Sequence, residues 1–151
     1  MKKHLLQLLI SITAFTSCSD DKKTTEEDNS SLMNTTRNFI RAALDGNFKE
    51  AKKYMLIDSS NVHYLNIAEG LYNNLDRPVK ESYAASSIII HSKEEALKDS
   101  LAVVVYSNSY KNNPDTLRVL KQNDRWLVDL KYLYEHDFDT LMQHIRKDTL
   151  K

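Results

Sequence analysis

The longest run of strand-like positions lies between Leu101 and Leu133. β-Branched, aromatic and leucine residues dominate three short segments of this run, and such residues favour strands. They are Val103, Val104, Val105 and Tyr106, then Leu117, Val119 and Leu120, then Trp126, Val128 and Tyr132. Turn signals separate the segments, because Asn112–Asp115 contains a proline and Asn123-Asp124 suits a compact hairpin. The pattern therefore predicts three antiparallel strands joined as a meander.

Two further observations extend this predicted sheet. The segment Tyr83–His91 contains three consecutive isoleucines and predicts a fourth strand, while the charged stretch Ser92–Ser100 predicts an exposed connection. In the last strand, alternation places Trp126 on the core face and Asp129 in solvent, because neighbouring side chains of a strand point to opposite sides. This alternation argues against Asp129 as a base in a cone-shaped pocket beside Trp126.

Apolar positions at helical spacing precede the sheet segments. The pattern predicts a helix over Leu32–Leu44, with Gly46 placed to end it. Asn47–Glu50 reads as a capping box that opens a short second helix. A third helix is expected to begin at Asp58-Ser59-Ser60 and to end at Pro78.

A last helix is predicted from roughly His136 to Lys147. Its apolar stripe is Phe138, Leu141, Met142 and Ile145. His136 and His144, with Asp139 nearby, suggest a metal site. The two histidines are, however, two turns apart, about 12 Å along the axis, which is too far for one ion. A solvated face is the better interpretation, and no metal is expected.

Three aromatic side chains are candidates for lining a pocket, namely Tyr64, Tyr72 and Trp126. Each is predicted to point inward, although aromatic residues at these spacings are more often part of the core. His63 projects outward among asparagines, and His91 is expected to end a strand beside a charged loop, with no neighbour in sequence to orient it. Neither histidine is therefore assigned a catalytic role.

Composition excludes several kinds of site. The chain has two glycines, too few for a dinucleotide-binding fingerprint, a P-loop or the nucleophile elbow of serine hydrolases. Its 21 Lys and Arg residues balance 21 Asp and Glu residues, so no net field attracts nucleic acid. The single cysteine, Cys18, excludes an intramolecular disulfide and a cysteine-rich zinc site. No cofactor is expected.

The amino terminus has the pattern of a secretory signal. Lys2 and Lys3 precede an apolar stretch, Leu5–Phe15, which is well short of the ~20 residues that span a bilayer. The tetrad Phe15-Thr16-Ser17-Cys18 resembles the bacterial lipoprotein cleavage motif, although leucine is more usual than Phe15. The resemblance implies that Cys18 becomes the mature N-terminus and carries a diacylglyceryl group and an N-acyl chain such as palmitate. The alternative is an ordinary signal peptide with an incidental cysteine.

The segment Ser19–Ser31 has no large apolar residue and predicts a flexible, charged tether. Its start, Ser19-Asp20-Asp21, also resembles a surface-export signal of Bacteroidota lipoproteins, and a merely solvated tether is an equally good interpretation. We thus expect a signal peptide over 1–17, a lipidated tether over 18–31 and one domain over 32–151. Several acyl chains give stable anchoring, so we expect the outer membrane, at its periplasmic or surface face.

The helices followed by a meander predict an α+β fold, with three N-terminal helices on one face of a curved antiparallel sheet of about four strands. The segments FIRAALDGNFKEAKKYM, SLAVVVYSNS and LKQNDRWLVDL resemble small lipoprotein domains of unknown function in the nuclear transport factor 2-like (cystatin-like) superfamily, of a type abundant in Bacteroidota. The resemblance covers roughly Leu32 to Leu133, and the helix after Tyr134 departs from the simplest pattern. That superfamily includes isomerase-like and dehydratase-like enzymes and many binding domains, and the fold alone does not choose between them.

Two main functions remain open, and a third, a purely structural or assembly role in the envelope, is not separable from the first of them by sequence. The preferred one is a lipid-anchored cell-envelope protein whose non-catalytic domain binds a protein partner or a small ligand. The other is an enzyme of isomerase or hydratase type that acts on a small hydrophobic substrate, which requires a buried acid or histidine beside Tyr64, Tyr72 or Trp126. A homodimer is a further expectation, because relatives of this fold often dimerise through the sheet.

Overall fold

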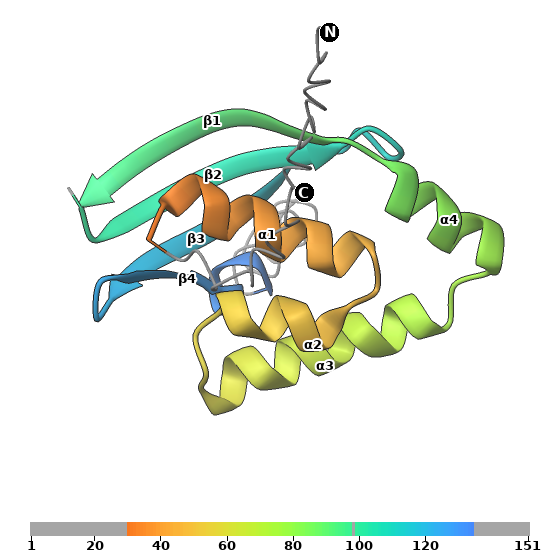
Figure 1. The fold of residues 1–151 in the computed structure, drawn as a ribbon, viewed down its shortest axis with the longest axis horizontal. Coiled ribbons are helices and arrows are strands. Elements are labelled where there is room, and N and C mark those ends of the chain that lie inside the picture. The colour runs from red at the N-terminus through yellow and green to blue at the C-terminus, as the bar shows by residue number, and fades with distance from the viewer. Residues whose placement is uncertain (1–29, 98, 135–151) are drawn as a thin grey trace, which may run out of the picture.

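The sheet has four antiparallel strands in the order β1-β2-β3-β4 (Figure 1). The computed structural model describes residues 30–97 and 99–134. The strands are β1 (Ile88–Leu97), β2 (Leu101–Asn108), β3 (Asp115–Gln122) and β4 (Arg125–Asp129). Each strand pairs with the next along the chain, which confirms the predicted meander.

Helices occupy the chain before the sheet. They are α1 (Leu32–Leu44), α2 (Phe48–Ala51), the 3₁₀ turn η1 (Lys52–Tyr54), α3 (Ser59–Asn73) and α4 (Arg77–Ala85). A short helical stretch over 130–134 follows β4 directly. The fold is therefore α+β, as predicted, with helices packed on a four-stranded antiparallel sheet. Cys18 and the helix predicted over 136–147, with His136, Asp139 and His144, lie outside the described residues.

Three predicted helix boundaries are confirmed by local geometry. Gly46 follows α1 with a φ of +72°, a conformation that glycine adopts without steric cost. The side chain of Asn47 accepts a hydrogen bond from the Glu50 N–H at 3.1 Å, and Asp58 accepts one from the Asn61 N–H at 2.9 Å. These side chains satisfy backbone donors that the first turn of a helix leaves without a partner.

The start of the sheet differs from the prediction. Tyr83–Ala85 belong to α4 rather than to a strand, and Pro78 lies in the first turn of α4 rather than ending the third helix. Proline suits a first turn because its φ is already helical and its missing N–H is not needed there. The charged stretch after His91 continues β1 as far as Leu97, and Ser92–Glu95 in it are exposed. An edge strand tolerates such charges, because they oppose pairing with other chains.

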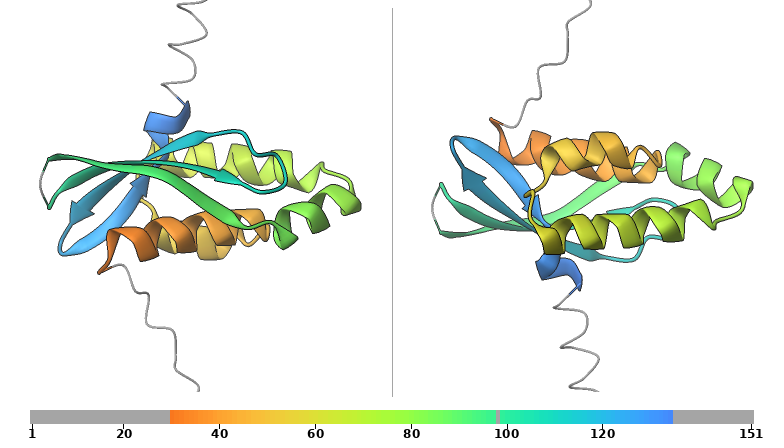
Figure 2. Two further views of the ribbon diagram at one scale, coloured as in Figure 1. Left: turned by 90° about the horizontal axis from the view of Figure 1, so that it is seen from above. Right: turned by 90° about the horizontal axis from the view of Figure 1, so that it is seen from below.

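The core lies between α1 and the inner face of β2, β3 and β4. Its most buried members include Phe39, Ile40, Ala102, Val104, Leu117, Val119, Trp126 and Val128. Burial of one such large side chain contributes about 1.5–3 kcal/mol. In both edge-on views, α1 begins beside the β3–β4 hairpin, and α4 lies at the opposite end of the domain (Figure 2). The domain therefore has two ends with different surroundings.

Asp129 is the main correction to the predicted sheet. Its side chain lies on the face opposite Trp126, as alternation requires, but Asp129 is only 1% exposed. The Nε and Nη2 atoms of Arg118 on β3 both donate to its Oδ2 atom, the Nε at 3.1 Å. The Arg118 guanidinium also lies 5.2 Å from the ring centre of Tyr132. Alternation gives the face of a side chain but not whether other groups cover that face, so the prediction that Asp129 lies in solvent is wrong.

Candidate functional site

A cavity of about 480 Å³ lies between α1, α3, α4 and the adjoining ends of β2 and β3. We call it the helix–sheet cavity. Its helical wall is largely apolar and includes Phe39, Ala43, Ala68 and Leu71. The end of the sheet supplies polar side chains, among them Tyr106, Asn108, Lys111 and Asp115. The cavity therefore offers an apolar wall and a polar end to the same bound molecule.

A carboxylate and two phenols form the centre of the polar end. Tyr106 on β2 and Asp115 on β3 are direct cross-strand partners, and the Tyr106 hydroxyl donates to Asp115 Oδ2 at 3.4 Å. Burial, and next the charge of Asp115, raise the pKa of Tyr106 far above its ordinary value. The same two causes raise the pKa of Tyr134, which also lines the cavity. Both phenols therefore stay protonated at neutral pH and act as hydrogen-bond donors.

A cation lies at the rim of the same end. The Lys111 Nζ atom lies 5.8 Å from the ring centre of Tyr83. A hydrogen bond with Tyr83 is the main cause that raises the pKa of Lys111. Tyr83 is held edge-to-face against Tyr110, with their ring centres 5.1 Å apart. The polar end thus combines one cation, one carboxylate and several phenols.

The structure places the three predicted pocket residues in different surroundings. Tyr72 lines the helix–sheet cavity and packs edge-on against Phe48, with ring centres 5.7 Å apart. Tyr64 stacks on Tyr134 at 4.6 Å with nearly parallel rings. Trp126 lies in the core, 7% exposed, and is not among the residues that line the cavity. Of the three, Tyr72 is the residue that the fold brings to the polar and apolar groups described above.

Sequence reasoning missed Tyr106, Lys111 and Asp115 as members of one site. Asp115 was assigned to a turn and Tyr106 to a strand, and the two stand on either side of the β2–β3 connection. In an antiparallel meander, residues that bracket a connection become cross-strand neighbours. A signal was therefore present, because an aromatic residue and an acid flank this connection.

The histidines of the described chain lie elsewhere. His63 is exposed on α3. His91 lies inside β1 at a bulge, and its Nε2 atom is 2.9 Å from Ser107 Oγ. The prediction that His91 ends a strand is wrong, because β1 continues to Leu97. The residue that contacts its ring, Ser107, comes from β2 and is distant in sequence.

The described residues contain neither a metal-binding cluster nor a membrane-spanning helix. Within 30–97 and 99–134, no group of three or more His, Cys, Asp or Glu side chains is arranged to hold a metal ion. No helix in that part of the chain has both the length and the apolar character needed to cross a membrane. Comparison with protein-family models, curated proteins and solved structures found no match. The candidate site is therefore defined by its geometry.

Proposed function

We propose that this chain is a lipid-anchored cell-envelope protein whose domain binds a small amphipathic ligand in the helix–sheet cavity. The observation that carries the proposal is the division of the cavity into an apolar helical wall and a polar sheet end. Binding sites for small molecules are mostly apolar, with a few polar groups that fix orientation, and about 300–1,000 Å³ in volume. The cavity, at about 480 Å³, has both properties.

The ligand chemistry follows from the two sides of the cavity. An apolar body would pack against side chains such as Phe39 and Leu71, and its polar group would lie at the sheet end. There, Asp115 accepts hydrogen bonds, while Lys111 and the tyrosine hydroxyls donate them. A hydroxyl or amide group, which can both donate and accept, matches this set of partners.

Two further parts of the proposal rest on the sequence and on the fold. Cys18 follows an apolar segment and small residues, which supports lipid anchoring in the envelope. Helices on a four-stranded antiparallel sheet around a cavity support membership of the nuclear transport factor 2-like superfamily. Incorporation of labelled palmitate tests the anchor, because we expect label in the wild type and none in Cys18→Ala. Equal label in both would contradict lipidation at this cysteine.

A neutral hydrophobic dye such as Nile red tests ligand binding in the cavity. Leu71 lines the cavity and is 63% exposed, so Leu71→Asp places a charge at the site without disturbing the core. Ile67 lies on the same helix, is 38% exposed and is not a lining residue, which makes Ile67→Asp the matched control. We expect Leu71→Asp to weaken dye binding roughly tenfold, equivalent to about 1.4 kcal/mol. Equal effects of the two variants would contradict binding in this cavity.

One observation favours the second candidate function, an isomerase-type enzyme. Asp115 shares the cavity with Tyr72, Tyr106 and Tyr134, so a proton acceptor lies beside protonated phenols. A carboxylate in such a place can remove a proton from a bound ketone while a phenol donates a hydrogen bond to its oxygen.

Deuterium exchange separates the two functions. Protein-catalysed exchange at the α-carbon of a cyclic ketone, followed by NMR and lost in Asp115→Asn, would support an enzyme. The Asn side chain keeps the shape of Asp115 but accepts a proton poorly, so dye binding should be retained. Dye binding without exchange in the wild type would favour the binding protein.

A further inference from the structure

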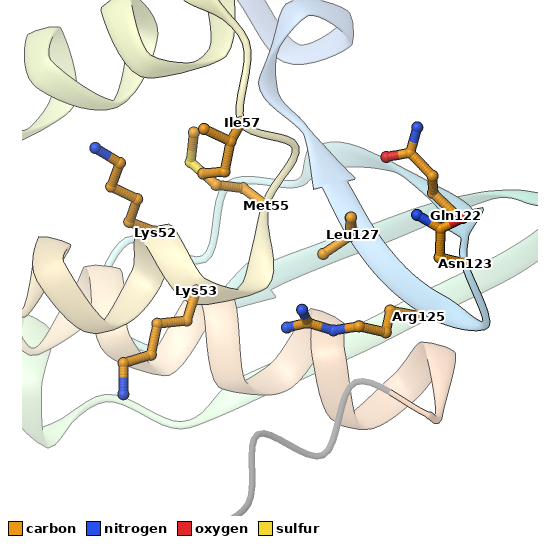
Figure 3. Close-up of a pocket in the computed structure, with 8 residues that line it drawn as sticks. All are labelled: Lys52, Lys53, Met55, Ile57, Gln122, Asn123, Arg125 and Leu127. Carbon is orange, nitrogen blue, oxygen red and sulfur yellow. The ribbon is translucent and has the colours of Figure 1, made fainter.

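A second cavity lies at the other end of the domain, between η1 and the β3–β4 hairpin (Figure 3). We call it the hairpin hollow, and its volume is about 490 Å³. Three cationic side chains line it, Lys52, Lys53 and Arg125, together with the amides of Gln122 and Asn123. The described lining includes no carboxylate. Apolar side chains, those of Met55, Ile57 and Leu127, complete the lining.

Backbone hydrogen bonds fix the shape of the hairpin hollow. The Leu56 N–H donates to the Val128 carbonyl at 2.9 Å, and Met55 forms a parallel bridge with Val128. The segment 55–57 is therefore held along the edge of β4. Met55 is 1% exposed, whereas Ile57 remains 64% exposed at the rim. The hollow thus has a frame fixed by backbone hydrogen bonds, with cationic side chains and one exposed apolar side chain around it.

Two acidic side chains among the described residues lie near the hairpin hollow, and each forms an ion pair. Lys53 Nζ lies 3.0 Å from Glu50 Oε2, so this carboxylate offsets one of the three positive charges. Asp124 lies 3.6 Å from Lys121, a cation outside the lining. The three cationic side chains of the lining favour an anion as occupant, and an anion with an apolar part would also cover Ile57.

The hairpin hollow lies at the end of the domain where the chain from Cys18 enters, and this position bears on the source of the anion. The α1 helix begins beside the β3–β4 hairpin, so the chain enters the domain at the end that carries the hollow (Figures 1 and 2). Cys18 precedes Ser30 by 12 residues, which span at most about 40 Å when extended. If Cys18 carries the proposed lipid, the end with the hairpin hollow stays within that distance of the bilayer.

We propose that the hairpin hollow binds anionic lipid headgroups at the membrane surface, an inference that rests on the proposed lipid anchor. The cations Lys52, Lys53 and Arg125 would contact phosphate groups, and Ile57 would enter the boundary between headgroups and acyl chains. Because the anchor keeps the domain close to the membrane, its effective concentration there is high. Weak individual contacts are therefore enough for the domain to bind the bilayer surface. The domain then lies on the bilayer with the helix–sheet cavity directed away from it.

A competing occupant is the acidic run Glu26-Glu27-Asp28, which stands just before α1. Its charge also suits the hairpin hollow. The tether Ser19–Ser31 has no large apolar residue, however, and so offers nothing to cover Ile57. A lipid headgroup above its acyl chains satisfies both the cations and the exposed isoleucine, and this favours the membrane.

Co-sedimentation with vesicles tests the proposal on the mature chain, residues 18–151, with Cys18→Ser. This protein carries no lipid, so failure here is distinguishable from failure of the anchor, which the palmitate experiment reports. We expect binding to phosphatidylcholine vesicles that contain phosphatidylglycerol and little binding to phosphatidylcholine alone. Added salt should reduce the binding, because it screens exposed charges.

Matched variants locate the contact. Lys52→Gln with Arg125→Gln should lower vesicle partitioning roughly tenfold or more. Arg77→Gln with Lys80→Gln removes the same charge from α4 at the opposite end of the domain and should change it little. Ile57→Ser should weaken binding at constant charge. Equal losses in the two double variants would overturn the proposal, because net charge alone would then explain binding.

Two other results would also overturn it. Replacement of the acidic run by Glu26→Gln, Glu27→Gln and Asp28→Asn leaves the hairpin hollow intact. If NMR signals of the residues around the hollow shift in this variant without vesicles, the tether is the occupant. If inorganic phosphate shifts those signals in the wild type while vesicles are not bound, the hollow is a site for free anions.

Discussion

The helix–sheet cavity and the hairpin hollow are similar in volume and opposite in construction. Packed side chains of α1 and α3 form the wall of the first, so its shape depends on the core. Backbone hydrogen bonds fix the shape of the hairpin hollow, and its charged groups lie on long side chains in contact with water. Substitutions of the buried residues around the helix–sheet cavity, such as Phe39, should therefore change stability together with binding. Substitutions around the hairpin hollow should change binding while the fold keeps its stability.

The largest expected effect is that of Asp129→Ala. This change leaves the Arg118 guanidinium without its partner and removes the carboxylate that accepts from the Lys131 N–H at 3.2 Å. Loss of a fully buried ion pair costs about 3–5 kcal/mol, and since the Arg118 side chain is 32% exposed we expect the lower end, about 3 kcal/mol. The helical stretch that carries Tyr134 into the cavity also loses its support. Urea denaturation followed by Trp126 fluorescence measures the free energy of unfolding. A loss below about 1 kcal/mol would show that the pair is not needed.

A control for this prediction is available at the hairpin. Lys121→Ala removes an ion pair with Asp124, in which the carboxylate side is fully exposed and the two atoms are 3.6 Å apart. Exposed pairs contribute little, so the free energy of unfolding should change by less than about 1 kcal/mol. A loss as large as that of Asp129→Ala would contradict the proposed difference between the two ends.

The next effect is that of Gly46→Ala beside the helix–sheet cavity. Gly46 has a φ of +72°, and a Cβ atom there would lie 2.4 Å from Tyr72 Cε1. The conformation alone costs about 1–2 kcal/mol in a non-glycine residue, and the Tyr72 ring must also move. We expect a loss of about 2 kcal/mol or more in urea denaturation.

The other glycine is the natural control. Nothing lies within 4 Å of a Cβ atom built at Gly70, which stands inside α3. Gly70→Ala should therefore stabilise the protein by about 0.5–1 kcal/mol, because alanine favours a helix interior. If the two substitutions changed stability in the same direction, the contact between Gly46 and Tyr72 would not control packing at the cavity.

The smallest expected effect concerns Asp58, which lies between the two ends. Hydrogen bonds from the Asn61 N–H and side chain, and then Lys131, lower the pKa of Asp58 from 3.8 to about 2. The unfolded chain therefore binds this proton at higher pH than the folded one does. The contribution of the ionised Asp58 to the free energy of unfolding is fully present above a pH of about 4 and is lost as the pH falls towards 2.

Asp58→Asn isolates this titration, because asparagine can still cap α3 but does not ionise. The difference in free energy of unfolding between wild type and variant should shrink as the pH falls through that window. Urea denaturation at a series of pH values measures it. A difference that is constant with pH would contradict the lowered pKa.

These two ends also differ in how much the sequence predicts. The caps at Gly46, Asn47 and Asp58 were predicted correctly, because each depends on residues within one turn of the chain. The hairpin at Asn123-Asp124 was equally local, and both residues have positive φ values as such turns require. The start of α4 was not predicted, because a proline such as Pro78 can either stop a helix or begin one.

Long-range pairing explains the remaining differences. Burial of Asp129 depends on Arg118, which is 11 residues away on another strand. The polar end of the helix–sheet cavity requires the register that sets Tyr106 opposite Asp115. The pairing of Tyr106 with Asp115 follows once the meander is drawn with its register. The burial of Asp129 also depends on the groups that cover its face, which the register alone does not give.

The bridge between Met55 and Val128 has a consequence for the order of folding. The strands can pair one after another as the chain lengthens, since each has its neighbour in sequence beside it. The helical half cannot close until β4 is present, because the Leu56 N–H needs the Val128 carbonyl and Asn61 Oδ1 accepts from the Leu130 N–H, 69 residues away. Closing such loops carries an entropic cost that only the complete sheet offsets. We therefore expect the nascent chain to stay open until synthesis has passed Leu130, a state that would suit transport of the unfolded chain across a membrane, as the proposed envelope location requires.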